Sequence, residues 1–183
     1  MTSAGSVGGR DRLRLFCALR LPDDVLDRLE PWQAAELRDG RVVPRGHLHI
    51  TLAFLGSRPA EELAAIADTL RGAAAGTGEI VLSAERYRET RSVGMVVLRE
   101  ETEEGGRLAE RLFGGLEGLG VYERERRPWL PHVTVVRFRT RPRLDPPVPD
   151  LGTFGPSDAA VYMSALRPSG AQYEVLESVP LGG

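Results

Sequence analysis

Apolar and polar positions alternate along Arg12–Leu21, and this period of two predicts a β-strand. Pro22 follows at a position where a helix can begin, and Asp23 and Asp24 supply the acidic first turn that favours a helix N-terminus. Apolar residues recur over Val25–Leu37 and give the predicted helix one hydrophobic face. The chain therefore begins with a strand that leads directly into an amphipathic helix.

Short runs rich in β-branched and aromatic residues predict the remaining strands. Glycine, proline or charged residues end each run and mark its bounds. These strands span His47–Leu55, Glu79–Arg88, Ser92–Arg99, Leu130–Phe138, Ala159–Leu166 and Gln172–Val179. Further helices are predicted after Ser57 and over 103–116, and the proline-rich stretch 141–149 predicts a surface loop. Short strands mixed with helices indicate an α+β fold, with helices covering one side of a mostly antiparallel sheet.

The length of 183 residues suits one domain, which we expect to span 11–183 behind a disordered tail at 1–10. That tail is small and polar, unlike a signal peptide, and no apolar run approaches the roughly 20 residues of a membrane span. Cys17 is the one cysteine, so it has no internal disulfide partner, which fits a reducing compartment. We therefore expect a cytoplasmic monomer that does not bind membranes.

The charge balance limits the partners and cofactors that the chain can use. Its formal net charge is −2, whereas a protein that grips long nucleic acid by the backbone is usually basic. A nucleic-acid partner should therefore be met at one end, in a local pocket. All 24 basic residues are arginine, so there is no lysine to act as a Schiff base or P-loop cation. No dinucleotide-binding glycine motif follows a strand either, and we expect no cofactor.

The three histidines all lie in two short segments that share one pattern. The segments are HLHITL at 47–52 and HVTV at 132–135, and each contains His-apolar-Thr-apolar inside a predicted strand. Residues i and i+2 point to the same face of a strand, roughly 6.6 Å apart. His49 therefore shares a face with Thr51, and His132 shares a face with Thr134. Two such strands side by side would present two imidazoles and two hydroxyls to one small site.

This set of side chains suits hydrolysis of a phosphodiester without a metal. A side-chain pKa of about 6.5 lets a neutral imidazole accept a proton from water while an imidazolium donates one to the leaving oxygen. Threonine hydroxyls can donate hydrogen bonds to the non-bridging oxygens as negative charge builds there. The motifs thus make His49 and His132 the candidate catalytic pair, and Thr51 and Thr134 the candidate phosphate-binding residues.

Four stretches of the sequence resemble one known family. They are RLFCALRLP near the start, HLHITLAFLG and PHVTVVRFR around the two motifs, and MSALRPSGAQYEVLESVPL at the end. They follow the family's order over nearly the whole chain, and Ser164, Gly170 and Tyr173 narrow the match to one branch. With the paired motifs, they make the chain similar to the two-histidine phosphoesterase superfamily. Within it, the chain resembles the RNA 2′,3′-cyclic phosphodiesterases, which are also called 2′-5′ RNA ligases.

The resemblance implies two pseudo-symmetric lobes with a central cleft, each lobe supplying one motif. It implies hydrolysis of a 2′,3′-cyclic phosphate, on an RNA end or a cyclic nucleotide, to a 2′-phosphate. It further implies that His49 is the proton donor to the leaving 3′ oxygen and that His132 is the acceptor that activates water. Thr51 and Thr134 hold the phosphate, and Arg137 matches an arginine that neutralises a phosphoryl oxygen.

Phe16 faces away from the apolar row of its strand by parity. At the cleft it would stack on a base, since aromatic stacking tolerates any base, and elsewhere it would pack in the core.

Three alternative functions stay open. His47 and His49 form a His-x-His pair to which His132 would add a third ligand of a catalytic zinc site, although the threonines have no role there. A non-catalytic module that binds RNA ends would keep the same cleft. The same residues would also join RNA ends by attack of a 5′-hydroxyl on the cyclic phosphate. Water's abundance makes hydrolysis the default, and we expect no metal.

Overall fold

Antiparallel strand pairing organises the computed structural model, which describes residues 11–182. The strands follow the spatial order β4-β5-β6-β3-β1-β7-β8, and β2 pairs with β6 beside this path. Their bounds are β1 (Arg12–Arg20), β2 (Arg41–Val42), β3 (His49–Pro59), β4 (Leu82–Glu89), β5 (Val93–Glu100), β6 (His132–Arg137), β7 (Asp158–Arg167) and β8 (Gly170–Val179). The expected α+β fold with a mostly antiparallel sheet is confirmed.

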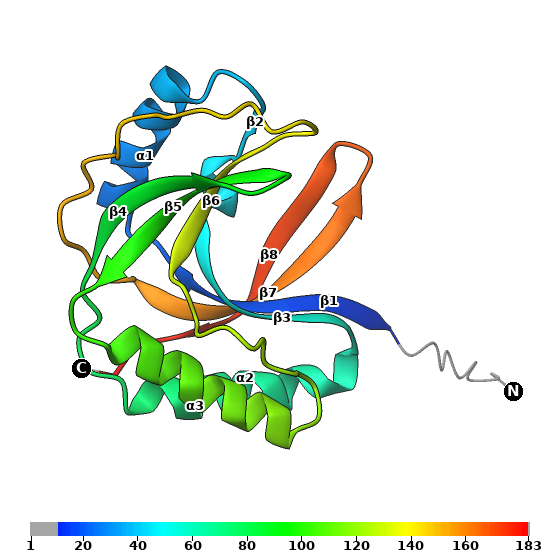
Figure 1. The fold of residues 1–183 in the computed structure, drawn as a ribbon. Coiled ribbons are helices and arrows are strands. Elements are labelled where there is room, and N and C mark those ends of the chain that lie inside the picture. The colour runs from blue at the N-terminus through cyan, green and yellow to red at the C-terminus, as the bar shows by residue number, and fades with distance from the viewer. Residues whose placement is uncertain (1–10, 183) are drawn as a thin grey trace, which may run out of the picture.

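The sheet divides into two halves that meet between β3 and β6. The first half-sheet comprises β3, β1, β7 and β8, and the second comprises β4, β5, β6 and β2. Within residues 11–182, the bridge recorded between β3 and β6 joins Ile50 to Val133, and both side chains are fully buried. Because β3 and β6 pair so briefly, the two half-sheets diverge on either side of this bridge (Figure 1).

Helices lie at opposite ends of the molecule (Figure 1). Helix α1 (Asp23–Glu36) lies beside β2 and β4 of the second half-sheet, whereas α2 (Leu63–Ala75) contacts β7 and β8 of the first. Helix α3 (Glu104–Gly118) packs along α2. Gly115 lies so close to the Thr69 side chain that a larger residue at this position would clash with it. No helix in the described part of the chain is long and apolar enough to cross a membrane.

The sequence pattern located most elements correctly and misjudged several boundaries. The strand predicted at His47–Leu55 begins only at His49, because residues 45–47 form the 3-10 turn η1 (Arg45–His47). It also continues past Gly56, which adopts a φ of 70° inside the strand instead of ending it. The helix predicted after Ser57 begins at Leu63, behind the 3-10 turn η2 (Ala60–Glu62). Strand β2 is too short to leave a pattern, and the predicted tail at 1–10 lies outside the described residues.

A buried glutamine ties α1 to the second half-sheet. The Gln33 side chain is 2% exposed, and its Nε2 donates to the carbonyl oxygens of Val43 at 3.1 Å and Val135 at 2.9 Å. Val135 O also accepts from the Val43 amide at 3.0 Å, so one amide group joins α1, the loop after β2, and β6. Gln33 thereby holds β6, the strand that contains the second motif, against the helix.

Replacing this amide with an apolar side chain of similar shape should destabilise the fold. We expect Gln33→Met to lower the free energy of unfolding by about 2 kcal/mol, because the buried Val43 carbonyl loses its donor. Urea unfolding followed by circular dichroism measures the change. Gln172→Met, at an exposed position of β8, is the matched control and should be nearly neutral. Equal stability of the two variants would contradict a structural role for the Gln33 amide.

Candidate active site

The Ile50–Val133 bridge sets how the two motifs face each other. In an antiparallel pair, this register places His49 opposite Thr134 and Thr51 opposite His132. Ile50 and Val133 point into the main hydrophobic core, so the histidines and threonines beside them point to the opposite face. The structure therefore brings together the four residues that the sequence predicted to share a site, with each histidine across from the other motif's threonine.

Backbone carbonyls fix both imidazoles in the same way. The Nδ1 of His49 lies 2.7 Å from the carbonyl oxygen of His47, and the Nδ1 of His132 lies 2.8 Å from that of Leu130. A carbonyl can only accept, so both Nδ1 atoms are protonated donors. Each motif thus uses the carbonyl two residues before its histidine to set the tautomer. In each neutral ring, Nε2 is then the unprotonated nitrogen, which can accept a hydrogen bond or a proton.

The environment of His49 favours its neutral form. Its Nε2 accepts a hydrogen bond from the Thr51 hydroxyl at 3.0 Å. The pKa of His49 is lowered to about 4, chiefly by burial and in smaller part by the positive charge of Arg137, while the bond to the His47 carbonyl partly opposes the shift. At neutral pH His49 is therefore an uncharged imidazole, and a bound anion is needed to make its protonated form common.

An aromatic cluster encloses His49 on the first half-sheet. Phe16 is 2% exposed, lies 5.0 Å from the His49 ring centre, and stacks on Tyr162 at 4.8 Å with the rings nearly parallel. Tyr173 meets Phe16 edge-on at 5.1 Å. Phe16 is thus a buried ring that packs against the imidazole, and the accessible ring beside it is Phe54, which is 67% exposed.

The two tyrosines of this cluster had no role in the site predicted from the sequence. Tyr162 is the register partner of Phe16 across β1 and β7, and Ser164 is the partner of Tyr173 across β7 and β8. Strand parity at Phe16 could have found Tyr162 only if the pairing of β1 with β7 were already known. The place of Tyr162 beside Phe16 is therefore set by long-range strand pairing, which a local sequence pattern does not reveal.

Two further residues connect the site to its surroundings. Arg137 is the exposed last residue of β6, and its charge lowers the pKa values of both His47 and His49, so it lies near both rings. Trp129 was not singled out by the sequence. Its indole N–H donates to the carbonyl oxygen of Thr51 at 3.0 Å, which ties the segment before β6 to β3 of the other half-sheet.

His47 does not extend the row of His49 and Thr51 along the strand. It lies in η1, and its ring packs 4.4 Å from the ring centre of Tyr173. Within residues 11–182, no group of three or more His, Cys, Asp and Glu side chains is arranged to hold a metal ion. The three-histidine zinc site considered from the sequence is thus not assembled by these residues.

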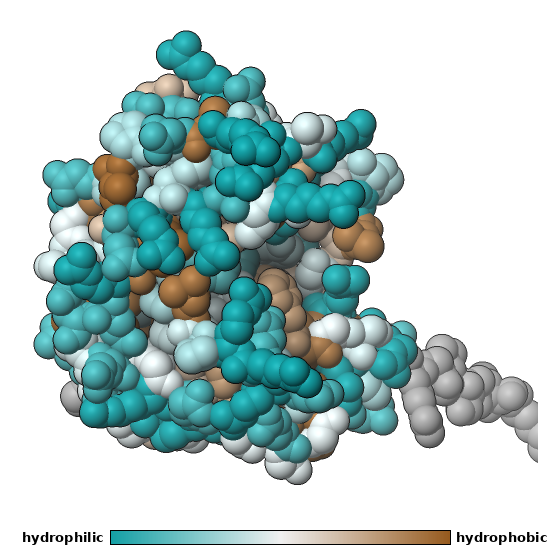
Figure 2. All heavy atoms as spheres, viewed as in Figure 1, coloured by the Kyte–Doolittle hydropathy of each residue, from teal (hydrophilic) through white to brown (hydrophobic). Residues whose placement is uncertain are grey.

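A hollow of about 380 Å³ lies next to the aromatic cluster. It is lined by Tyr162, Tyr173, Leu48 and two arginines, Arg20 and Arg45. A hollow is also visible in Figure 2, between the second half-sheet and the β7–β8 hairpin. Among the residues that the structure describes, the lining of the 380 Å³ hollow includes neither motif histidine and no strand residue of the second half-sheet, so this hollow lies beside the motif residues and not between them.

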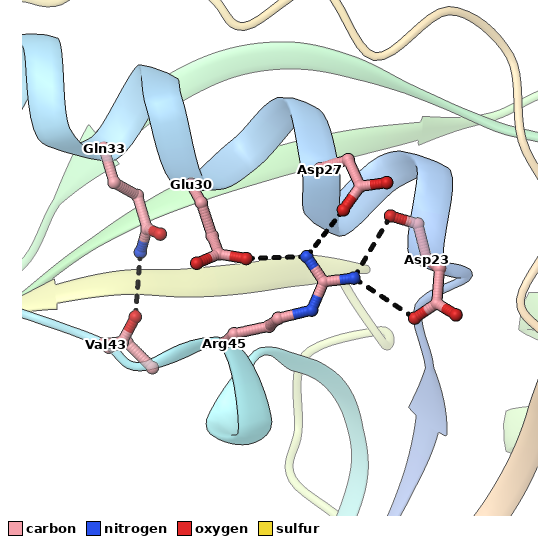
Figure 3. A network of polar contacts seen from close by, with 6 residues as sticks. All are labelled: Asp23, Asp27, Glu30, Gln33, Val43 and Arg45. Atoms are coloured by element: carbon pink, nitrogen blue, oxygen red, sulfur yellow. Dashed lines mark hydrogen bonds and ion pairs between the residues drawn. The ribbon is translucent and has the colours of Figure 1, made fainter.

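Both arginines of the 380 Å³ hollow are already paired with carboxylates. Arg20 forms a two-pronged ion pair with Asp158. Arg45 contacts Asp23 at 3.2 Å, Asp27 at 2.8 Å and Glu30 at 2.6 Å along α1 (Figure 3). These contacts raise the pKa of Arg45 above its usual value and neutralise its charge locally.

Comparison with known proteins gives relatives that match nearly the whole chain. The model of the 2′-5′ RNA ligase superfamily matches residues 21–161. A Thermus thermophilus protein named RNA 2′,3′-cyclic phosphodiesterase is 34% identical, over 93% of this chain and 91% of its own length. An Escherichia coli protein of the same name is 27% identical, over 90% of this chain and 94% of its own length. A crystal structure of a protein from Thermus thermophilus superposes with a TM-score of 0.79 and 31% identity, covering 93% of this chain and 99% of the other.

Burial of a neutral His49 should make the fold sensitive to acid. The unfolded chain protonates this ring near pH 6.5, whereas the folded chain resists until about pH 4, so stability is lost as the pH falls between these values. We expect the wild type to lose about 3 kcal/mol more than His49→Gln between pH 7 and pH 4. Urea unfolding at both pH values measures the difference. Equal losses, or an NMR titration midpoint of the His49 ring near 6.5, would contradict the burial argument.

Proposed function

The chain belongs to the 2′-5′ RNA ligase superfamily, and on that premise we propose that it opens 2′,3′-cyclic phosphate ends of RNA to 2′-phosphates. Two relatives that match over most of their own length are named RNA 2′,3′-cyclic phosphodiesterase, which supports this substrate class. The observation that carries the proposal is the matched setting of the two imidazoles. Each has Nδ1 held by a carbonyl, beside a threonine hydroxyl, on one face of the sheet.

In the proposed reaction the cyclic phosphate lies between the Nε2 atoms of His49 and His132. His132 accepts a proton from water as the water oxygen bonds to phosphorus. The bond from phosphorus to the 3′ oxygen breaks, and His49 donates its proton to that oxygen. The products are a 2′-phosphate and a free 3′-hydroxyl, and proton exchange with solvent returns both rings to their starting forms.

The phosphate itself prepares the donor in this scheme. His49 is neutral in the free protein because burial lowers its pKa. A phosphate anion in contact with Nε2 favours the imidazolium and raises that pKa, so protonation follows substrate binding. Thr51 and Thr134 donate hydrogen bonds to the non-bridging oxygens, and Arg137 neutralises part of their charge. None of these steps requires a metal.

The second imidazole and its threonine come from the other half-sheet, so the proposed chemistry needs both halves of the fold. We infer that residues 11–183 act as one catalytic domain. A 5′-hydroxyl that attacks phosphorus in place of water would break the same bond to the 3′ oxygen and join RNA ends through a 2′-5′ linkage at the same site.

Removing either imidazole should abolish turnover. Purified protein is incubated with excess chelator and a short RNA ending in a 2′,3′-cyclic phosphate, and the product is identified by phosphorus NMR. We expect a 2′-phosphate from the wild type, and rates lower by about 10²–10⁴-fold in His49→Ala and His132→Ala.

His47→Ala is the matched control, since it removes the third histidine ring but keeps the carbonyl that orients His49. It should retain most of the activity. Loss of wild-type turnover in chelator would instead favour a metal-dependent hydrolase, and absence of turnover without chelator would favour a binding module.

Removing a threonine hydroxyl should slow the chemical step more than it weakens binding. We expect Thr51→Val and Thr134→Val each to lower kcat by about 10–100-fold, because the hydroxyls stabilise charge that grows in the transition state. Steady-state kinetics on the same RNA measure kcat and KM separately. Thr→Ser at each position keeps the hydroxyl and should recover most of the rate. An unchanged kcat in both valine variants would show that the hydroxyls do not contact the reacting phosphate.

A further inference from the structure

Strand register extends the candidate site across the second half-sheet. Val97 of β5 pairs with His132 on one side and with Arg86 of β4 on the other. Met95 likewise pairs with both Thr134 and Arg88. Directly paired residues point to the same face of a sheet. Across that face, each motif residue of β6 therefore has a buried apolar residue of β5 beside it and an arginine of β4 beyond that.

These arginines are close to the site and accessible. Two strand spacings separate β6 from β4, which places Arg86 and Arg88 roughly 10 Å from the motif residues, measured between backbones. Arg99 lies two residues beyond Val97 on the same face. We call Arg86, Arg88 and Arg99 the arginine strip. Hydrophilic side chains gather over β4 and β5 in Figure 2, where this face is in view.

The arginine strip has more positive charge than its neighbours neutralise. Arg86 and Arg99 share one carboxylate, that of Glu85, at 3.4 Å and 3.8 Å, and their side chains are 54% and 62% exposed. Arg88 is exposed, and no carboxylate lies within ion-pair distance of it among residues 11–182. Exposed contacts of this length contribute little, so the guanidinium groups remain available to another anion.

The arginines of the 380 Å³ hollow offer no comparable charge. Arg20 and Arg45 line this hollow beside the tyrosines, and carboxylates occupy both of them. A chain of phosphates approaching the site would therefore find unneutralised arginines on the β4–β5 side and paired ones in the hollow. This asymmetry gives a direction to the path of a longer substrate.

We propose that the arginine strip binds backbone phosphates of the RNA strand on the 5′ side of the cyclic end. The inference rests on the proposed function and adds that the enzyme prefers the end of an RNA oligonucleotide to a cyclic mononucleotide. Exposed guanidinium groups next to a catalytic pair match the backbone of single-stranded RNA, because contact is electrostatic and independent of sequence. It also fits a net charge of −2, since only a short segment of RNA is gripped.

The test compares two substrates in one set of variants. Rates are measured for adenosine 2′,3′-cyclic phosphate and for a six-nucleotide RNA with the same end, across a series of salt concentrations. In Arg86→Gln/Arg88→Gln we expect kcat/KM for the RNA to fall at least about fivefold at low salt, with the mononucleotide unchanged. The slope of log kcat/KM for the RNA against log salt should decrease by about 1.4, at roughly 0.7 for each phosphate that the variant no longer neutralises.

Arg28→Gln/Arg38→Gln is the matched control, because it removes two exposed arginines in and just after α1. It should change neither substrate. An RNA rate and salt slope equal to those of the wild type in Arg86→Gln/Arg88→Gln would overturn the strip while leaving the hydrolysis intact. Equal losses for both substrates would also overturn it, since the arginines would then act on the reacting phosphate. Failure of the wild type on both substrates would instead contradict the proposed function itself.

Discussion

The short bridge between Ile50 and Val133 is the constraint on which the rest of the site depends. It joins two half-sheets that otherwise diverge, and its antiparallel register puts each histidine opposite the other motif's threonine. A shift of one residue would turn every motif side chain into the core and every core side chain out. Full burial of both bridge residues makes such a shift costly, so the core that stabilises the fold also fixes the geometry of the site.

The two motifs are alike in backbone geometry but differ in environment. Both imidazoles have Nδ1 bonded to the carbonyl two residues before, yet only His49 lies against Phe16, Tyr162 and Tyr173. The aromatic cluster excludes water from one ring and so lowers its pKa. Repetition of a motif therefore supplies two similar groups, and the aromatic walls around His49 make its neutral form the favoured one until an anion binds.

The sequence predicted the parts of the fold that depend on local patterns. Alternation located β1, a run of β-branched and aromatic residues located β3, and the His-x-Thr spacing picked out the four residues that the structure brings together. Each of these patterns is a local property of the sequence. It failed where long-range contacts decide. His47 was placed in the strand, but Pro44 leads into a 3-10 turn that turns its ring onto Tyr173. The role of Phe16 depended on the pairing of β1 with β7, which no local pattern contains.

The distribution of charge over the surface also depends on the fold, and the composition alone does not give it. The sequence contains 24 arginines and has a net charge of −2, from which only a weak affinity for long nucleic acid follows. Folding sorts those arginines into two classes. Arg45 is surrounded by three carboxylates of α1, whereas Arg88 faces solvent on the sheet face that contains the motif residues. An acidic protein can thus present a locally basic surface, because the acidic residues that balance its charge are paired with arginines elsewhere in the fold.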